Sequence, residues 1–273
     1  MAKRSTSILQ LFIVVCVFLV AVVPFYLLIL ISLKSPQGGL SALQLVPDWH
    51  LDNFSAAWAK SQMGRAMLNN FIITTGGVLL LVLLSSMAGY SIARVGNIVN
   101  KAIFTIFLLC MMVPGIINTV PLYTLLIKIK GIDTYWAMIF VLTTNALPFS
   151  VFLYTGFIKT VDTDLEESAM MDGCSHARSF WLIIFPLLKP VTASVIILQG
   201  LTFWNNYAQA VFFLQSQKMR NIPLAISLFF QQYGANWPHM AAAALIGLFP
   251  AVVAFLFFQK LFISGMFEGS VKG

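Results

Sequence analysis

Four polar side chains recur at helical spacing within an otherwise apolar stretch, and their types suit the binding of a polar solute. They are Gln199, Thr202, Asn206 and Gln209. Because neighbouring members lie three or four positions apart, a helix over residues 185–214 would carry all of them on one face. Amide groups donate and accept hydrogen bonds, which matches the paired hydroxyls of a sugar, and Trp204 and Tyr207 offer aromatic faces for its C–H surfaces. Such side chains also join helices across membrane interfaces. Pathway lining and interhelical contact are therefore equal alternatives for this face.

A charged stretch broken by glycine, DLEESAMMDGCSHARSFWLIIFPLLKP, covers residues 164–190 between two hydrophobic runs. Thr163 and Glu166 have the spacing of a capping box, which predicts a short helix with Glu166 and Glu167 in its electropositive first turn. We expect Gly173 to end this helix, because glycine adopts the left-handed conformation of helix C-termini without strain.

A second helix is expected directly after the glycine. Ser175 can cap it, and Ala177 and Phe180 begin an apolar face at helical spacing. Pro186 and Pro190 close the unit. A helix that lies on the membrane surface without a partner would explain the apolar face. It would leave the acidic cluster unexplained, since acidic residues gain nothing from anionic lipid.

The elements that position both stretches are predicted to be membrane-spanning helices. Of the 273 residues, 59% are hydrophobic and only 9% are charged, whereas soluble domains carry about 25% charged residues. A bilayer core of about 30 Å needs roughly 20 apolar residues of helix to cross it. The predicted spans are residues 8–33, 67–93, 102–127, 135–158, 185–214 and 240–264. We therefore predict an all-α polytopic membrane protein with six transmembrane helices, forming one domain over residues 1–273.

Two segments outside these spans need separate interpretation. The first apolar run is far longer than the roughly 7–15 apolar residues of a signal peptide, so it is expected to be a retained span. In the loop after it, residues 35–66, the spacing of Phe54, Ala57, Trp58 and Met63 predicts a short helix at the membrane interface.

Several classes of protein are excluded by what the sequence lacks. There is no G-x-x-x-x-G-K-[ST] phosphate loop, so the chain is not expected to bind ATP or Mg²⁺ itself. His50, His176 and His239 do not combine with Ser or Cys and an acidic residue into a catalytic pattern, and the three cysteines fit neither a metal site nor a disulfide framework. We expect no enzyme active site, no metal and no cofactor. The net charge of +7 comes from scattered Lys and Arg, which indicates loops facing anionic lipid rather than nucleic acid.

The orientation of the chain is only weakly indicated by charge. Lys3 and Arg4 precede the first span and favour a cytoplasmic N-terminus. Six spans then return the C-terminus to the cytoplasm and place the loop over residues 159–186 there as well.

The loop carries a family resemblance. Glu167, Ala169, Gly173, Ile183 and Pro186 match the EAA signature of permease subunits of binding-protein-dependent ABC importers, with Ser for the second residue of the motif and Phe for its Leu. In that family this loop is the coupling helix that docks into a cleft on the cytoplasmic ATPase, so the resemblance implies a docking surface. The implied ATPase-coupling residues are Glu166, Glu167, Ala169, Asp172, Gly173, Ala177, Phe180 and Pro186.

Other stretches resemble carbohydrate-uptake permeases of the maltose-transporter type, in particular its shorter six-span subunit. They are VPGIINTVPLYTLLIKIKGIDTYWAMI, LTFWNNYAQAVFFL and the tail LFISGMFEGSVKG. The resemblance implies a multi-pass protein of a prokaryotic inner or plasma membrane that imports a sugar. Its implied partners are a second permease subunit, a cytoplasmic ATPase dimer that uses ATP and Mg²⁺, and an extracytoplasmic solute-binding protein. It also implies that the tail from Glu268 to Gly273 reaches the ATPase.

Two alternatives remain open at this point. The same architecture can import another solute, such as a polyol, a glycerol phosphate or a peptide. A secondary carrier is the weaker alternative, because proton- or sodium-coupled carriers usually keep a charged group inside the membrane and no Asp or Glu lies in a predicted span.

Overall fold

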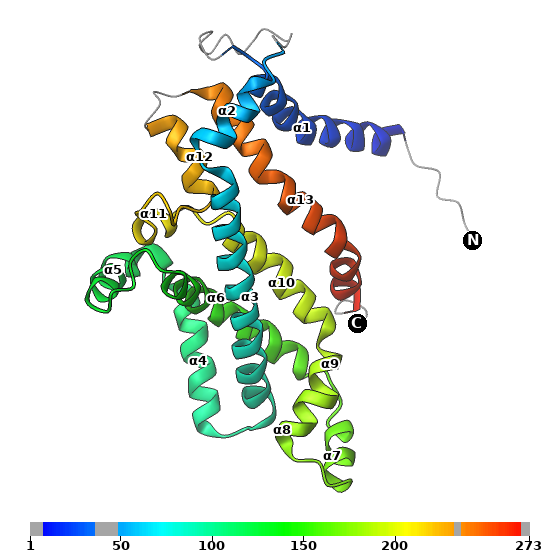
Figure 1. Cartoon of the computed structure of the whole chain (residues 1–273). Coiled ribbons are helices and arrows are strands. Elements are labelled where there is room, and N and C mark those ends of the chain that lie inside the picture. The colour runs from blue at the N-terminus through cyan, green and yellow to red at the C-terminus, as the bar shows by residue number, and fades with distance from the viewer. Residues whose placement is uncertain (1–7, 36–48, 232–235, 269–273) are drawn as a thin grey trace. The chain divides into compact units, whose positions relative to one another are not determined.

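All regular structure is helical in the computed structural model, which describes residues 8–35, 49–231 and 236–268 (Figure 1). The all-α prediction is therefore confirmed for these ranges. The helices in chain order are α1 (Ile8–Ser32), α2 (Asp52–Lys60), α3 (Met63–Arg94), α4 (Ile98–Met112), η1 (Gly115–Asn118), α5 (Thr119–Lys128), α6 (Tyr135–Ile158), α7 (Asp164–Met171), α8 (His176–Ser179), η2 (Phe180–Ile184), α9 (Phe185–Leu187), α10 (Lys189–Trp204), α11 (Ala210–Phe213), α12 (Ile222–Gln231) and α13 (Trp237–Glu268).

The predicted spans correspond to four unbroken helices and two bent pairs. The unbroken helices are α1, α3, α6 and α13, each long and apolar enough to cross a membrane. The helix α6 has the predicted bounds, and the Thr134 hydroxyl caps its first turn by accepting from the Ala137 N–H at 3.4 Å. Counting each bent pair as one span brings the number to six.

The predicted span over residues 102–127 is bent rather than continuous. The helix over Ile98–Met112 and the helix over Gly115–Lys128 meet at 94°. Pro114 explains the break, because the residue before a proline is pushed out of the helical region and Val113 is extended at φ −87° and ψ 118°.

The predicted span over residues 185–214 is also interrupted. The segment His176–Leu187 meets Lys189–Trp204 at 72°, beside Pro190, which has no N–H for the helical hydrogen bond to residue 186. The helix then ends at Trp204, and only the single turn α11 follows. The Asn205 side chain donates to the Leu201 carbonyl at 3.1 Å, so it competes with the backbone for the acceptor of the last helical turn.

Two compact units make up the chain, and the second one, residues 65–224 with 250–273, holds the sites described below. Its core contains the fully buried Leu81 of α3, Tyr154 of α6, Ile184 of η2 and Val195 of α10. The helices α3 and α6 approach closely at Gly89, where a Cβ would lie 2.7 Å from that of Tyr154. Only glycine fits at this crossing, so α3 is held firmly along α6.

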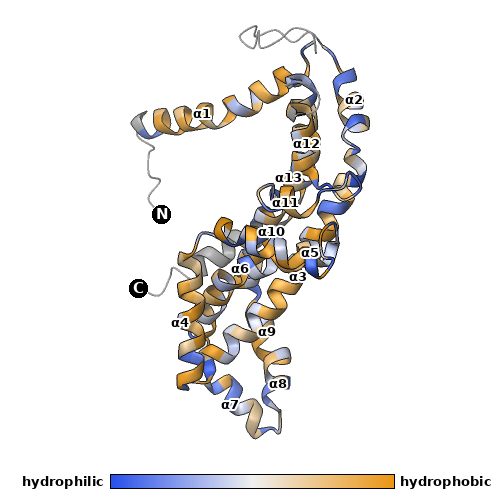
Figure 2. Ribbon diagram, turned by 90° about the vertical axis from the view of Figure 1, so that its left-hand side faces the viewer, coloured by the Kyte–Doolittle hydropathy of each residue, from blue (hydrophilic) through white to orange (hydrophobic). Residues whose placement is uncertain are grey.

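The first unit, residues 1–64 with 225–249, ties α2 to the end of α1. Asn53 Nδ2 donates to the carbonyls of Ser32 at 2.9 Å and Lys34 at 2.8 Å. The short helix expected in the loop after α1 is thus present as α2, although Met63 already belongs to α3. Side chains along α1 are almost all exposed, and Figure 2 shows the helix hydrophobic along its length, as a lipid-facing helix would be.

The helix α12 was missed by the sequence patterns. It has 10 residues, too few to cross a bilayer, and its apolar run IPLAISLFFQ does not distinguish a short helix from a strand.

Candidate functional site

The predicted helix, glycine turn and second helix are all present. We call α7 to α9, residues 164–187, the docking hairpin, after the role that the family resemblance implies for this segment. Gly173 follows α7 at φ +85°. The Cys174 N–H donates to the Ala169 carbonyl and the Gly173 N–H to the Met170 carbonyl, both at 3.0 Å, which is the bonding of a Schellman motif. Ser175 then caps the second helix, since its hydroxyl accepts from the Arg178 N–H at 3.4 Å. The α7–α8 turn lies at one end of the unit (Figure 1).

The capping box itself is absent. Thr163 has helical backbone angles and makes no side-chain cap, and the Asp164 N–H is bonded instead by Asp162 Oδ1 at 3.1 Å. Glu166 does not fold back to the helix start, because its carboxylate is occupied elsewhere. Its Oε1 accepts from Arg94 Nε at 2.5 Å, and its Oε2 accepts from the Tyr90 hydroxyl at 2.6 Å.

The implied coupling residues divide into a buried and an exposed set. The sequence groups Glu166, Ala169 and Phe180 with the docking surface, whereas the structure buries them at 4%, 8% and 4% exposure. Glu166 bonds Tyr90 and Arg94 of α3, and Phe180 lies against the Tyr90 ring, so the buried members support the exposed face rather than form it. The exposed members are Glu167, Asp172, Gly173, Ala177 and Pro186.

The exposed face of the hairpin combines acidic and apolar groups. Glu167 and Asp172 supply the negative charge, while Leu165 and Met171 add apolar area at 47% and 89% exposure. An apolar centre with a charged rim is the usual composition of a protein interface. Met171 was not named by the sequence patterns, since within α7 it reads as an ordinary core position.

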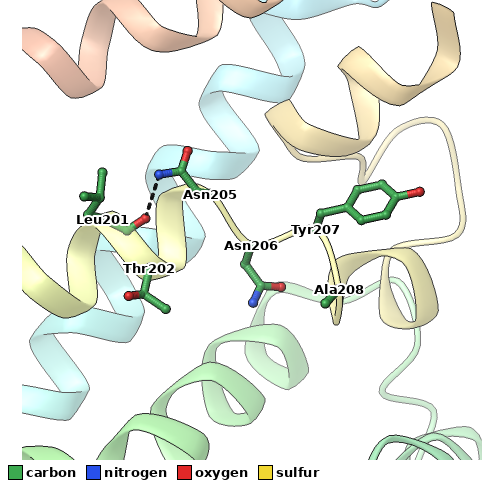
Figure 3. A pocket seen from close by; sticks show the side chains of 6 residues that line it. All are labelled: Leu201, Thr202, Asn205, Asn206, Tyr207 and Ala208. Carbon is green, nitrogen blue, oxygen red and sulfur yellow. Dashed lines mark hydrogen bonds between the residues drawn. The ribbon is translucent and has the colours of Figure 1, made fainter. Parts of the chain in front are cut away.

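A second site is an open hollow of about 550 Å³ after the end of α10. It is lined by Leu201, Thr202, Asn205, Asn206, Tyr207 and Ala208. Figure 3 shows the side chains of Thr202 and Asn206 directed to one side of the chain and that of Asn205 to the other.

The predicted polar face is wrong beyond Trp204, because the helix does not continue to Asn206 and Gln209. Of the implied pathway residues, the hollow brings together Thr202, Asn206 and Tyr207. Gln199, Trp204 and Gln209 are half-buried and do not line it. Sequence reasoning missed Leu201, Asn205 and Ala208. The pair of adjacent asparagines was the available signal, since asparagine favours helix ends over helix interiors.

Asn206 has a clear structural role in this loop. Its Oδ1 accepts from the Gln209 and Ala210 N–H groups, both at 3.3 Å, at the start of α11. Its own carbonyl accepts from Asn221 Nδ2 at 2.7 Å. Among the described residues, the Thr202 hydroxyl bonds only within its own helix, to the Leu198 carbonyl at 2.8 Å. Its exposed side chain leaves it the better placed of the two to meet a solute.

The predicted tail contact falls at the edge of the described residues. Glu268 is the last residue of α13, and Gly273 lies outside the described ranges.

The fold, with four unbroken candidate spans and two bent pairs, is that of a helical, multi-pass membrane protein. Residues 81–267 match the family described as "Binding-protein-dependent transport system inner membrane component", and the chain belongs to this family of inner-membrane transport permeases.

Curated relatives cover almost the whole chain. The "Melibiose/raffinose/stachyose import permease protein MelC" of Bacillus subtilis (strain 168) is 40% identical over 253 residues, 92% of this chain and 91% of that protein. The "Arabinooligosaccharides transport system permease protein AraQ" of the same organism is 32% identical over 92% of this chain and 90% of its own.

Solved structures share the fold. A chain from the crystal structure of a bacterial ABC transporter that imports the acidic polysaccharide alginate matches with a TM-score of 0.77 at 16% identity, over 95% of this chain and 98% of that one. A chain of the MetNI methionine ABC transporter matches with a TM-score of 0.56 at 16% identity, over 77% of this chain and 98% of its own.

Proposed function

We propose that this chain is a transmembrane permease subunit of an ATP-driven importer for sugars or oligosaccharides and that it forms half of the translocation pathway. Family membership supports the transport role. The sugar class is supported by the names of relatives that are 40% and 32% identical over most of the chain. Thr202, Asn205 and Tyr207 in the open hollow are the groups we assign to the pathway, since hydroxyl, amide and aromatic groups suit a sugar.

The observation that carries the coupling role is the exposed face of the docking hairpin. Gly173 and the Schellman motif give it a defined turn, and Glu167, Asp172 and Met171 project from it without a partner helix of the same unit covering them. We assign this face to contact with a cytoplasmic ATPase dimer, in which Glu167 would pair with a basic residue. ATP and Mg²⁺ belong to that partner, and the chain itself is not an enzyme.

The remaining partners follow from the same proposal. A second permease subunit would complete the pathway, and an extracytoplasmic solute-binding protein would deliver the sugar on the side opposite the hairpin. Both termini would then be cytoplasmic, with the tail from Glu268 to Gly273 directed toward the ATPase. Sugars and membrane lipid are the small-molecule partners, and nucleic acid is not expected.

Charge reversal on the exposed face tests the docking role. Glu167→Lys is expected to abolish retention of the ATPase during purification while the permease still inserts in the membrane, because an exposed acidic group becomes repulsive to a basic partner. Glu167→Gln, which only neutralises the charge, should retain part of the ATPase. Uptake of labelled melibiose, raffinose and arabinooligosaccharides is measured in the same cells and in cells that lack the gene.

The two parts of the proposal fail separately in this experiment. Full retention of the ATPase by Glu167→Lys would show that the hairpin is not the ATPase contact. Uptake of every tested sugar at the normal rate without the gene would instead move the substrate class to another solute, such as a polyol, a glycerol phosphate or a peptide.

A further inference from the structure

The end of α3 holds the docking hairpin through a buried ion pair. Arg94 is the last residue of α3, and its Nε donates to Glu166 Oε1 of α7 at 2.5 Å. The two side chains are only 14% and 6% exposed. The other arm of the guanidinium, Nη2, donates at 2.9 Å to the carbonyl of Val161, in the segment that leads into α7. The planar guanidinium of Arg94 therefore bonds both the hairpin and the segment that connects it to α6.

Tyr90, one helical turn earlier in α3, makes a second contact with the hairpin. Its hydroxyl donates to Glu166 Oε2 at 2.6 Å, so both carboxylate oxygens are bonded by residues at positions i and i+4 of α3. A carboxylate held at both oxygens cannot rotate or slide along α3 without losing a charged hydrogen bond.

The ring of Tyr90 also reaches the second arm of the hairpin. It lies 5.0 Å, between ring centroids, from Phe180 of η2. Phe180 in turn contacts Trp181 at 4.9 Å and Phe185 at 6.0 Å. One turn of α3 thus touches both helical arms of the hairpin, α7 through the ion pair and η2 through the aromatic cluster.

We propose that Tyr90 and Arg94 are positioning residues that clamp the docking hairpin to the end of α3, so that a movement imposed on the hairpin by the ATPase is carried directly into this span. The inference rests on the proposed function for its driving partner. The clamp itself rests on contacts within one unit of the chain. Glu166 is the group being held, and its exposed neighbour Glu167 is the group that meets the partner.

A rigid link is what such a transmission requires. Coupling between two sites is carried by packed elements whose arrangement both sites bias. Gly89, where α3 and α6 approach closely, lies one residue before Tyr90, so the clamped turn of α3 is itself packed against the core. A shift of the hairpin would therefore displace α3 rather than be absorbed at a loose joint.

The test measures whether the hairpin and α3 keep a constant distance. Spin labels are placed at two exposed positions outside the proposed ATPase contact, Leu182→Cys in η2 of the hairpin and Gly96→Cys just beyond α3, where no atom lies within 4 Å of an added Cβ. The native cysteines Cys16, Cys110 and Cys174 are first replaced by serine. The complex with its partner permease and ATPase is studied without nucleotide and with ATP and vanadate.

The informative variant is Tyr90→Phe, which removes one hydroxyl and keeps the ring contact with Phe180. Its matched control is Tyr154→Phe, which removes another interhelical hydroxyl bond, to Thr192 of α10 at 2.9 Å, in which no residue of the hairpin takes part. Glu166→Gln and Arg94→Lys are measured as stronger changes to the same clamp. Tyr90→Phe keeps the experiment decisive if the stronger variants fail to assemble.

We expect one narrow distance distribution in both nucleotide states for the unmodified complex and for Tyr154→Phe. In Tyr90→Phe the distribution should be broader than in the unmodified complex without nucleotide, and broader still with ATP and vanadate. The ATP hydrolysed per imported raffinose should rise at least about fivefold, the lower end of typical coupling between sites. A purely structural hydroxyl would lower complex yield and leave both readouts unchanged. An unchanged distribution in Tyr90→Phe, Glu166→Gln and Arg94→Lys would overturn the clamp.

Failure of the proposed function gives a different result. An unmodified permease that does not retain the ATPase would refute the docking role. The clamp would still be tested by comparing the width of the distance distribution between Tyr90→Phe and the unmodified permease without nucleotide. Absence of raffinose transport by the unmodified complex would concern the substrate alone.

Discussion

The docking hairpin and the loop after α10 are both places where a helix ends, and they are held in different ways. In the hairpin, the helix end and the next helix start depend on residues close in sequence, namely Gly173 at φ +85° and the Ser175 cap. In the loop, side chains from distant segments also bond the backbone carbonyls. Asn70 donates to the Trp204 carbonyl at 3.2 Å, and Asn221 donates to that of Asn206 at 2.7 Å. Local determinants leave a recognisable spacing in the sequence, whereas distant ones do not.

The position of the hairpin nevertheless depends on contacts with a distant segment, the end of α3. The local motif makes the turn, but Arg94 and Tyr90 of α3 determine which face of α7 is turned inward. The comparison therefore predicts that the hairpin has two kinds of sensitive position, one that sets its shape and one that sets its attachment.

The largest effect is expected from removing the attachment. Glu166→Ala leaves the nearly buried guanidinium of Arg94 without its partner, and breaking a buried pair in this way costs about 3–5 kcal/mol. Glu167→Ala, one residue along on the exposed side of α7, should change stability by less than about 0.5 kcal/mol. Thermal unfolding of the detergent-solubilised protein compares the two. Equal losses for both variants would show that the adjacent glutamates do not differ in the way described.

A smaller effect is expected from disturbing the shape of the turn. Gly173→Val forces a β-branched residue into the left-handed region, at a cost of about 1–3 kcal/mol. Gly173→Asn is the matched control, since asparagine tolerates this conformation and no atom lies within 4 Å of an added Cβ. We expect valine, but not asparagine, to reduce the amount of ATPase that co-purifies. Similar losses with both residues would indicate a steric requirement at the docked surface instead of backbone strain.

The smallest effect is expected in the loop after α10. Asn206→Leu removes the acceptor of two N–H groups at the start of α11, and each lost hydrogen bond should cost about 0.5–1.5 kcal/mol. Uptake should fall only as far as the yield of folded complex falls. Thr202→Val keeps the shape of a side chain whose hydroxyl bonds only its own helix. It should leave the yield unchanged and raise the apparent KM for sugar uptake. The reverse pattern would make Asn206 the solute contact and Thr202 the structural residue.

Much of the fold follows from composition and local spacing. Long apolar runs must be helical in a bilayer, because no water is present to bond a free backbone group, and α6 has the predicted bounds, residues 135–158. The hairpin was predictable for a related reason. A glycine at a helix end and a serine at a helix start satisfy backbone groups within a few residues, so the spacing alone carries the information.

The tertiary structure alone decided which of two adjacent glutamates is buried. Glu166 and Glu167 are identical in type and both lie in the first turn of α7. Only Glu166 meets Arg94 and Tyr90, from a helix more than 70 residues earlier in the chain. At the end of α10, tertiary contacts add to the local bond from Asn205 to the Leu201 carbonyl. The polar periodicity of residues 199–209 continues past Trp204, but side chains from α3 and from the segment before α12 bond the carbonyls of Trp204 and Asn206. A periodic pattern records which residues would share a helical face, and it carries no information about the distant groups that bond the backbone where the helix stops.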